Sequence, residues 1–415
     1  MKKFDLYIFL KNGYVLSLLL FVVTIPFDRL SNSIFVFLLG LFWLLNLLLN
    51  KQFAFSWNKF LFLFVSIFLL QLLSVLYSEN FKVAQYNIEK YLPLLLMPIF
   101  LSNNEVKNIK RSAVLKTFIA SCLISFIISF ILSLYKNYQI NDLETIIPYL
   151  LFVNVTKNVG ISHVYFGLFL SFTTLCLITN LSNHCRKRYA TYFLISLCVA
   201  CLLVVGAKMS ITALILIIIV LIIRYSIKTK KIFRGLVIVF LVFLASGVSV
   251  YKIPFARDRF STLIDPRNYF VGDNHWNSIG TRVSLSYCSF HLIKEKLLFG
   301  YGTGDVQEAV DRCLKENKFT TLEGMSAHNQ YIQYALSTGL IGLIAFLLCL
   351  ILPLKIALLS ENLYYFNFLL LIALASLTES ILGVNKGIVF YSFFNSFLAF
   401  NSPNRVSQLK KEKVC

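Results

Sequence analysis

The residues that could do chemistry gather in one stretch of the chain, residues 280–342. This stretch holds Arg282, a glycine run at 300–304, and the pair His328 and Asn329 where an apolar segment begins. The planar guanidinium of arginine can bind a phosphate through two parallel hydrogen bonds. A histidine at the mouth of a helix bundle can titrate near neutral pH and serve as a general base. The stretch therefore predicts the outer face of an active site.

Each of these residues also has a structural interpretation, which the sequence leaves open. Arg282 is equally consistent with an anchor at the membrane interface, the commoner role for that residue type. The glycine run lacks the GK[ST] ending of a P-loop, so the backbone N–H groups around Gly302 either cradle an anion or belong to a plain turn. His328 can be a capping or interfacial residue instead of a base.

Two further charged residues stand close to apolar runs. Lys208 lies in a three-residue turn between two such runs, and Glu379 closes another. A charge so near hydrocarbon is costly unless it serves a site, finds a partner or reaches the interface. We expect Lys208 to face the site. Glu379 is expected to pair with a site arginine or to orient His328, with an ordinary interfacial glutamate near Lys386 as the alternative.

The elements that must position these residues are membrane helices. Of the 415 residues, 58% are hydrophobic and only 14% are charged. The apolar runs are long enough to cross a hydrocarbon layer of ~30 Å. The fold class is therefore all-α, a polytopic integral membrane protein. The net charge of +20 does not indicate nucleic acid, because the basic residues are spread over the connecting loops, as topology signals and contacts with membrane lipids are.

Hydropathy predicts about twelve transmembrane helices. With the N-terminus in the cytoplasm, the inside segments hold 21 Lys and Arg residues and the short outside loops hold 7, so both termini are expected to be cytoplasmic. The twelve expected spans are 15–27, 34–49, 60–77, 92–101, 113–135, 161–181, 191–205, 209–223, 235–251, 331–352, 363–380 and 387–400. Residues 1–415 form one transmembrane domain, and a long outward loop, 252–330, separates spans nine and ten.

The long loop is expected to form a subdomain over the bundle. Within 278–298, Val283, Phe290, Ile293 and Leu297 recur at helical spacing, which predicts a helix lying on or near the membrane surface. The loop also holds Cys288 and Cys313. An outward-facing location permits a disulfide between them, but the sequence equally allows two free thiols. The cysteines lie mostly in apolar runs and form no Cys/His cluster, so no metal site is expected.

The ordered set of motifs resembles the O-antigen ligase and O-antigen polymerase superfamily of bacterial envelope glycan assembly. The similar segments are RDRFSTLID with Arg259, GTRVSLSYCSFHLIKEKLLFGYGTG, HNQYIQYALSTGLIGL, the turn GAKMS with Lys208, and LTESILGVNKG with Glu379. Together they cover roughly residues 206–387. The superfamily's turn usually carries an arginine, so the lysine at 208 keeps the charge but loses the bidentate fork.

The resemblance implies a twelve-helix, metal-independent membrane glycosyltransferase of the GT-C type in the bacterial inner membrane. Its donor would be a glycan on undecaprenyl diphosphate, presented at the periplasmic face. Arg282 and Lys208, with Arg259, would hold the diphosphate, and His328 would activate the acceptor hydroxyl. Asn329, Gly302 and Glu379 would complete the substrate-binding set, with no cofactor.

The acceptor stays open on sequence alone. A ligase transfers the glycan to lipid A–core, which we favour, whereas a polymerase extends another lipid-linked glycan. A protein O-oligosaccharyltransferase of the same superfamily would use a Ser or Thr side chain. The alternative from another class is a flippase for lipid-linked oligosaccharides. It is less consistent with the sequence, because the candidate residues gather at one face and no inverted repeat is evident.

Overall fold

The chain is described by a computed structural model over residues 2–50, 53–138, 153–181, 188–241 and 278–401. Its described elements are helices, with a single antiparallel bridge between Phe55 and Asn103. The α-helices of the first half are α1 (Lys2–Thr24), α2 (Arg29–Leu49), α3 (Lys59–Ser74), α4 (Phe81–Leu101), α5 (Asn104–Asn108), α6 (Arg111–Tyr138), α8 (Val153–Lys157), α9 (His163–Leu181), α10 (Arg188–Val205) and α11 (Lys208–Lys228).

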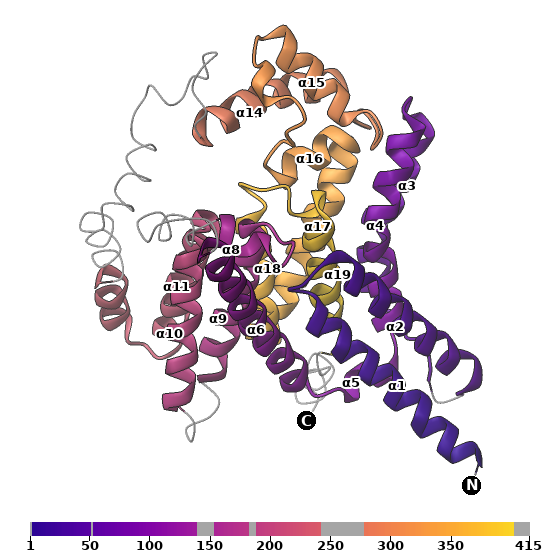
Figure 1. The fold of residues 1–415 in the computed structure, drawn as a ribbon, viewed down its shortest axis with the longest axis vertical. Coiled ribbons are helices and arrows are strands. Elements are labelled where there is room, and N and C mark those ends of the chain that lie inside the picture. The colour runs from indigo at the N-terminus through magenta and orange to yellow at the C-terminus, as the bar shows by residue number, and fades with distance from the viewer. Residues whose placement is uncertain (1, 51–52, 139–152, 182–187, 242–277, 402–415) are drawn as a thin grey trace.

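The second half carries the outer helices and the end of the bundle. Its α-helices are α14 (Ser278–Glu295), α15 (Val306–Glu316), α16 (Gln330–Ser337), α17 (Gly339–Leu359), α18 (Leu363–Ala375) and α19 (Asn385–Phe400), and a short apolar helix, Ile232–Leu241, precedes them. Three single 3-10 turns are η1 (Val75–Tyr77), η3 (Thr320–Leu322) and η4 (Ile381–Gly383). Figure 1 shows α14 and α15 at one end of the molecule, beyond α16, with α18 and α19 inside the bundle.

The protein is an all-α multi-pass membrane protein, but the expected twelve spans are not confirmed. Among the described residues, eight helices are long and apolar enough to cross a membrane. The other four expected spans fall short for different physical reasons. Helix α4 carries Lys82, Glu89 and Lys90, α18 and α19 have only 13 and 16 residues, and span 235–251 continues into residues outside the description.

Two expected helix boundaries are wrong. The span expected at 92–101 is the second half of α4, which begins at Phe81 because the Asn80 side chain accepts a hydrogen bond from the Val83 N–H, and which runs through both internal prolines. The span expected at 331–352 is divided between α16 and α17. The division falls at Gly339, which has a positive φ of 67°.

The division between α16 and α17 is fixed by a segment that passes beside it. The Leu340 N–H donates to Leu297 O at 2.8 Å, and the Tyr301 N–H donates to Leu336 O at 2.8 Å. A Cβ on Gly339 would lie 2.2 Å from Leu298 O, so only glycine allows this approach. The chain after α14 is thereby bonded to the start of the membrane helix α17.

The core of the bundle is built from phenylalanine. Helix α9 is its centre, with 78% of its apolar window buried. Fully buried rings from α6, α9, α18 and α19 meet there at centroid distances of 4.8–6.1 Å, namely Phe118, Phe169, Phe172, Phe368, Phe390 and Phe394. Offset and edge-on aromatic pairs add packing energy beyond area burial. This core holds α18, and with it the segment that follows α18.

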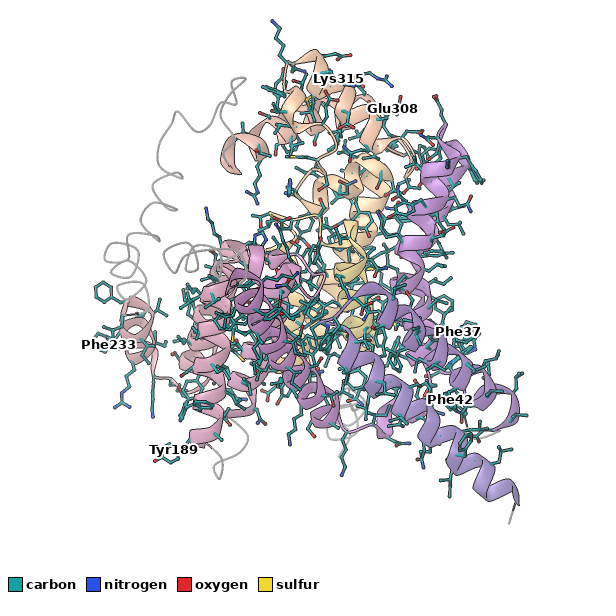
Figure 2. All side chains as sticks on the ribbon, viewed as in Figure 1. Phe37, Phe42, Tyr189, Phe233, Glu308 and Lys315 are labelled. Atoms are coloured by element: carbon teal, nitrogen blue, oxygen red, sulfur yellow. A yellow bond between two sulfur atoms is a disulfide. The ribbon has the colours of Figure 1, made fainter. Side chains whose placement is uncertain are left out.

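A second, smaller core belongs to the outer helices. It joins α14, α15 and α16 through Leu285, Leu292, Val310, Leu314 and Leu336. In the apolar stripe expected on α14, Val283 and Phe290 are exposed, and the residues of this helix buried in the outer core include Leu285 and Leu292. In Figure 2, the charged side chains Glu308 and Lys315 project from α15, whereas Phe37 and Phe42 lie on α2.

Candidate active site

Three charged side chains from distant parts of the chain meet at the junction of the two cores. The Arg282 guanidinium donates from Nη2 to Glu379 Oε1 at 3.2 Å, and His328 Nδ1 lies 3.2 Å from Glu379 Oε2. The Glu379 side chain is only 14% exposed, whereas those of Arg282 and His328 are 39% and 31% exposed. The carboxylate thus lies at the bottom of the cluster, and its two basic partners are accessible from outside.

Glu379 lies in a turn and not within a membrane helix, since α18 ends at Ala375. The turn is bonded to the start of α16 at three points. The Gln330 N–H donates to Ser376 O at 2.8 Å, the Asn329 amide donates to Leu377 O at 3.0 Å, and the Leu382 N–H donates to Gln330 Oε1 at 2.6 Å. These bonds hold Glu379 beside His328.

Asn329 has a structural task in this arrangement. Its side-chain oxygen caps α16 by accepting from the N–H groups of Tyr331 and Ile332 at 2.9 and 3.2 Å, while its amide nitrogen holds the Glu379 turn. The sequence predicted Asn329 as a substrate-binding residue. The structure shows how Asn329 fixes the residue before it, His328.

His328 has an unusual backbone, with φ at 47°, in the left-handed region that few residues other than glycine adopt. This conformation comes immediately before the Asn329 cap and lets the ring face the Glu379 carboxylate. If Nδ1 carries the proton and donates to Glu379, Nε2 keeps its lone pair. That tautomer is the one a general base needs, and an adjacent carboxylate is the usual way to select it.

Residues 191–347 match the family model described as O-Antigen ligase. They form an O-antigen ligase family domain. The domain contains Lys208, Arg282 and His328, whereas Glu379 comes from the helices that follow it. An uncharacterized protein of Haemophilus influenzae is similar to this chain, with 24% identity over 403 residues, which cover 95% of this chain and 94% of that protein.

The other predicted residues of the family domain are not part of the three-residue cluster. Lys208 is the first residue of α11 and is exposed, after a turn in which Gly206 has a φ of 63°. Arg259 lies outside the described residues. The structure therefore brings together Arg282, His328 and Glu379, and leaves the roles of Lys208 and Arg259 as predictions.

The glycine run 300–304 is a packing element in this structure. The Gly302 N–H donates to Ser337 O at 2.9 Å, and the N–H groups of Thr303 and Gly304 donate to the hydroxyls of Ser74 and Ser78 at 3.1 Å each. The prediction that the backbone near Gly302 holds an anion has no support in this geometry, because these donors bond within the protein. Gly302 instead allows a close approach to η1.

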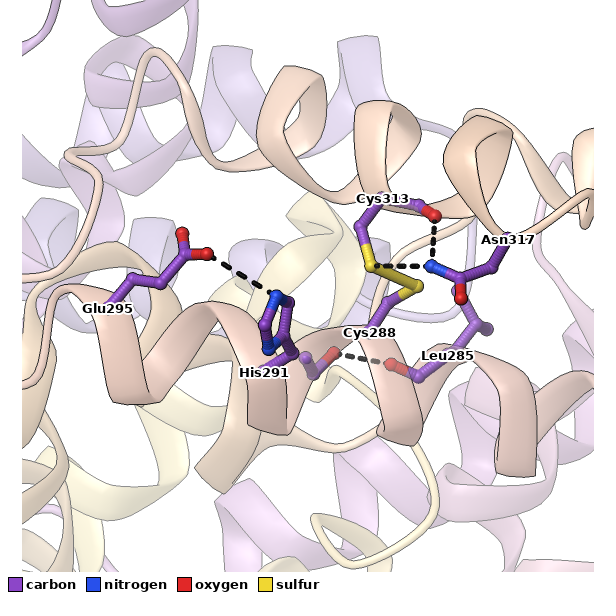
Figure 3. The surroundings of a disulfide bond; sticks show 7 residues. Leu285, Cys288, His291, Glu295, Cys313 and Asn317 are labelled. Atoms are coloured by element: carbon purple, nitrogen blue, oxygen red, sulfur yellow. Dashed lines mark hydrogen bonds and ion pairs between the residues drawn. A yellow bond between two sulfur atoms is a disulfide. The ribbon is translucent and has the colours of Figure 1, made fainter.

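The disulfide left open by the sequence is present. Cys288 of α14 and Cys313 of α15 are joined, and Figure 3 shows the bridge between the two helices, with the exposed pair His291 and Glu295 also on α14. The bridge lies six residues after Arg282, so it fixes the helix that presents the guanidinium. Residues 278–330 are thus a stapled unit over the bundle.

Three positioning residues were missed by sequence reasoning. Gln330 bonds the Glu379 turn, as described above. Asp305 accepts from the N–H groups of Glu79 and Asn80 at 2.8 Å each and thereby docks α15 onto the start of α4. Lys386 is buried. In the sequence, these three residues stand out only as polar residues at or beside the start of a helix. That position does not show which distant residues they contact.

Lys386 contacts the first outer turn of the chain and not Glu379. Its Nζ donates to Asp28 O and Asn32 Oδ1 at 2.9 Å and to Ile25 O at 3.3 Å. Asp28 caps α2 by accepting from the Leu30 and Ser31 N–H groups, and hydrogen bonding from the Ser31 hydroxyl lowers the pKa of that carboxyl. Asp28 is thus a helix cap.

Proposed function

We propose that this protein is an inverting membrane glycosyltransferase that transfers a glycan from undecaprenyl diphosphate to an acceptor hydroxyl. The observation that carries the proposal is the Glu379 carboxylate shared by Arg282 and His328 at 3.2 Å each. The O-antigen ligase family domain and the apolar helices agree with a lipid-linked glycan as the substrate class.

The reaction assigns one task to each side chain. Glu379 accepts the Nδ1 proton of His328 in a hydrogen bond, so that Nε2 removes the proton of the acceptor hydroxyl as its oxygen attacks the anomeric carbon. The bond between that carbon and the diphosphate oxygen breaks, and the leaving diphosphate keeps the electron pair. Arg282 stabilises the negative charge that develops on the diphosphate. Lys208 and Arg259 are proposed to add positive charge to the same group.

The proposed orientation places this site at the periplasmic face of the bacterial inner membrane, with both termini in the cytoplasm. The basic bias of the connecting loops supports it. Reporter fusions after Lys231 and near Gly272 should report opposite sides of the membrane, and reports from the same side would reject this topology.

The preferred acceptor is the sugar hydroxyl of a lipid A–core. Purified protein in proteoliposomes would be given a lipid diphosphate-linked glycan together with lipid A–core, a second lipid-linked glycan or a Ser/Thr-containing peptide. Glycan on lipid A–core identifies a ligase, and glycan on either other acceptor assigns a polymerase or a protein glycosylase. Movement of the donor across the bilayer without any transfer would overturn the enzymatic proposal in favour of a flippase.

A further inference from the structure

A groove of about 520 Å³ lies between α2, α4 and α19, outside the three-residue cluster. Its walls are mainly apolar and include Val36, Leu41, Leu96 and Phe100. Gly40 forms part of the wall, where an added Cβ would lie 2.7 Å from the Phe100 ring. Glycine at this turn therefore lets α2 pack closely against the Phe100 ring, and a larger residue would displace that ring in the wall of the groove.

The groove lies on helix surface that faces lipid. Helix α2 contains the candidate span Leu30–Leu49, only 17% of whose apolar window is buried. Phe37 lines the groove and is 70% exposed, and Figure 2 shows it on α2. The exposed apolar surface of a candidate span favours a hydrocarbon chain over a water-soluble molecule as the occupant.

One end of the groove is polar and lies near the candidate active site. Asn32 and Asn385 line that end, and the Lys386 ammonium beside them donates to Asn32 Oδ1 at 2.9 Å. Asn385 is three residues after Leu382, whose N–H is bonded to Gln330 Oε1. Three residues span at most ~11 Å of chain. The groove thus opens within a short distance of the segment that carries His328.

The charges around the groove indicate whether it suits the diphosphate head or the uncharged chain of a lipid. Glu89 is the one charged side chain that lines the groove, and its carboxylate would repel a phosphate. The Lys386 ammonium already donates to three protein oxygens and is 6% exposed. A diphosphate head therefore belongs at Arg282 and not in the groove, whereas an uncharged chain meets no penalty along these walls.

We propose that this groove binds the isoprenoid chain of the lipid diphosphate donor while the diphosphate lies at Arg282. The assignment rests on the proposed function for the identity of the donor. The groove would place the donor lipid on one side of the bundle, between α2 and α4. The diphosphate of that lipid would then reach the three-residue cluster from the side on which α19 begins. The chain anchors the donor, and the polar rim at Asn32 and Asn385 marks where the chain leaves hydrocarbon.

The test is photolabelling of the full-length protein in nanodiscs by a polyprenyl diphosphate that carries a diazirine on its chain and no glycan. The expected label falls on peptides from α2 and α4 that contain Val36, Leu41 or Leu96. Excess unlabelled polyprenyl diphosphate should compete, and excess phospholipid should not. Label elsewhere in the protein, or equal competition by phospholipid, would overturn the proposal.

Two groove-filling variants sharpen the test. Gly40→Leu and Val36→Trp are each expected to lower labelling by about tenfold, because each removes the burial of a few carbon groups of the chain. The matched control is Leu48→Trp, since Leu48 is 70% exposed on the same helix and does not line the groove. Unchanged labelling in Val36→Trp would count against the groove.

A third variant separates this inference from the proposed function. His328→Ala should be labelled like the wild type, because the chain site does not use the base. If all proteins are labelled in the groove but wild type transfers no glycan, the proposed function fails and the chain site stands. If wild type transfers glycan and the groove is never labelled, only the chain site fails.

Discussion

Two regions of this molecule each hold a charge at the edge of the bundle, and they treat it in opposite ways. The Lys386 ammonium is 6% exposed and donates to three oxygens that all belong to α1, α2 or the turn between them. The Glu379 carboxylate is also mostly buried, but its two partners are basic side chains that are about one-third exposed. One region is closed, and the other remains accessible.

This difference separates a structural charge from one that we propose to be reactive. A buried ammonium with a full set of fixed acceptors keeps helices together and has no capacity for a ligand. A carboxylate that holds an accessible guanidinium and an accessible imidazole can keep both oriented while each meets substrate. A buried charge can thus serve folding at α19, and we propose that another serves chemistry beside α16, according to the partners of each.

The largest effect is expected for His328→Ala, which removes the proposed general base. Glycan transfer should fall by ~10²–10⁴ with unchanged expression, because only the proton acceptor is lost. Initial rates in proteoliposomes measure this. The matched control is His291→Ala, since His291 lies exposed on α14 and pairs only with Glu295 in the described contacts. Equal rates in the two variants would remove His328 from the reaction.

Glu379→Gln is expected to lower transfer by about 10², somewhat less than loss of the base. The amide cannot hold Arg282 by charge, and it no longer selects the proton on Nδ1. Glu361→Gln is the control, because Glu361 forms an exposed ion pair with Lys228 at 2.7 Å. If Glu379→Gln transfers glycan normally, the carboxylate takes no part in the reaction. The proposed distinction between Glu379 and the structural Lys386 would then fail.

Lys386→Met should have the opposite effect to the variants in the three-residue cluster. It should lower the stability of the fold but change the rate of transfer per folded molecule little. Three oxygens lose their donor, which we expect to cost ~2 kcal/mol in the free energy of unfolding. Thermal unfolding in detergent measures the first quantity, and transfer normalised to folded protein measures the second. Lys355→Met, at an exposed position on α17, is the control. A specific rate as low as that of His328→Ala would place Lys386 in the reaction.

The smallest effect on transfer is expected when Cys288 and Cys313 are both replaced by serine. Leu285 and Leu292 still pack α14 in the outer core, so Arg282 should remain close to Glu379. The unit 278–330 should nevertheless become more sensitive to protease, since the disulfide constrains its unfolded chain. Non-reducing mass mapping of wild type should recover the joined peptides, and free thiols at both positions would contradict the bridge.

The sequence singled out three residues that the structure places in contact, although their roles in a reaction stay predictions. Arg282, His328 and Glu379 stood out because charged side chains beside long apolar runs need a partner or a task. It could not show that Glu379 binds both others at once. That pairing depends on the Asn329 and Gln330 bonds to the turn after α18, which join segments about fifty residues apart.

The same limit explains the wrong expectations. A glycine run looks like an anion-binding turn until its partners are known, and the Gly302 N–H is used by Ser337 of the broken helix. Apolar residues occur all around α14, so the sequence could not show that Leu285 and Leu292 pack in the outer core, and the surface location expected for this helix stays a prediction. Hydropathy likewise could not place the break at Gly339.

The left-handed backbone at His328 affects which residues a screen of variants would favour at this position. A φ of 47° strains most residues that carry a side chain, by ~1–3 kcal/mol, but is comfortable for glycine and better tolerated by asparagine. The residue that would stabilise the fold most at position 328 is thus not the residue proposed to support glycan transfer. A library of variants screened only for resistance to heat should drift towards glycine or asparagine at 328, whereas a library screened for transfer should return histidine.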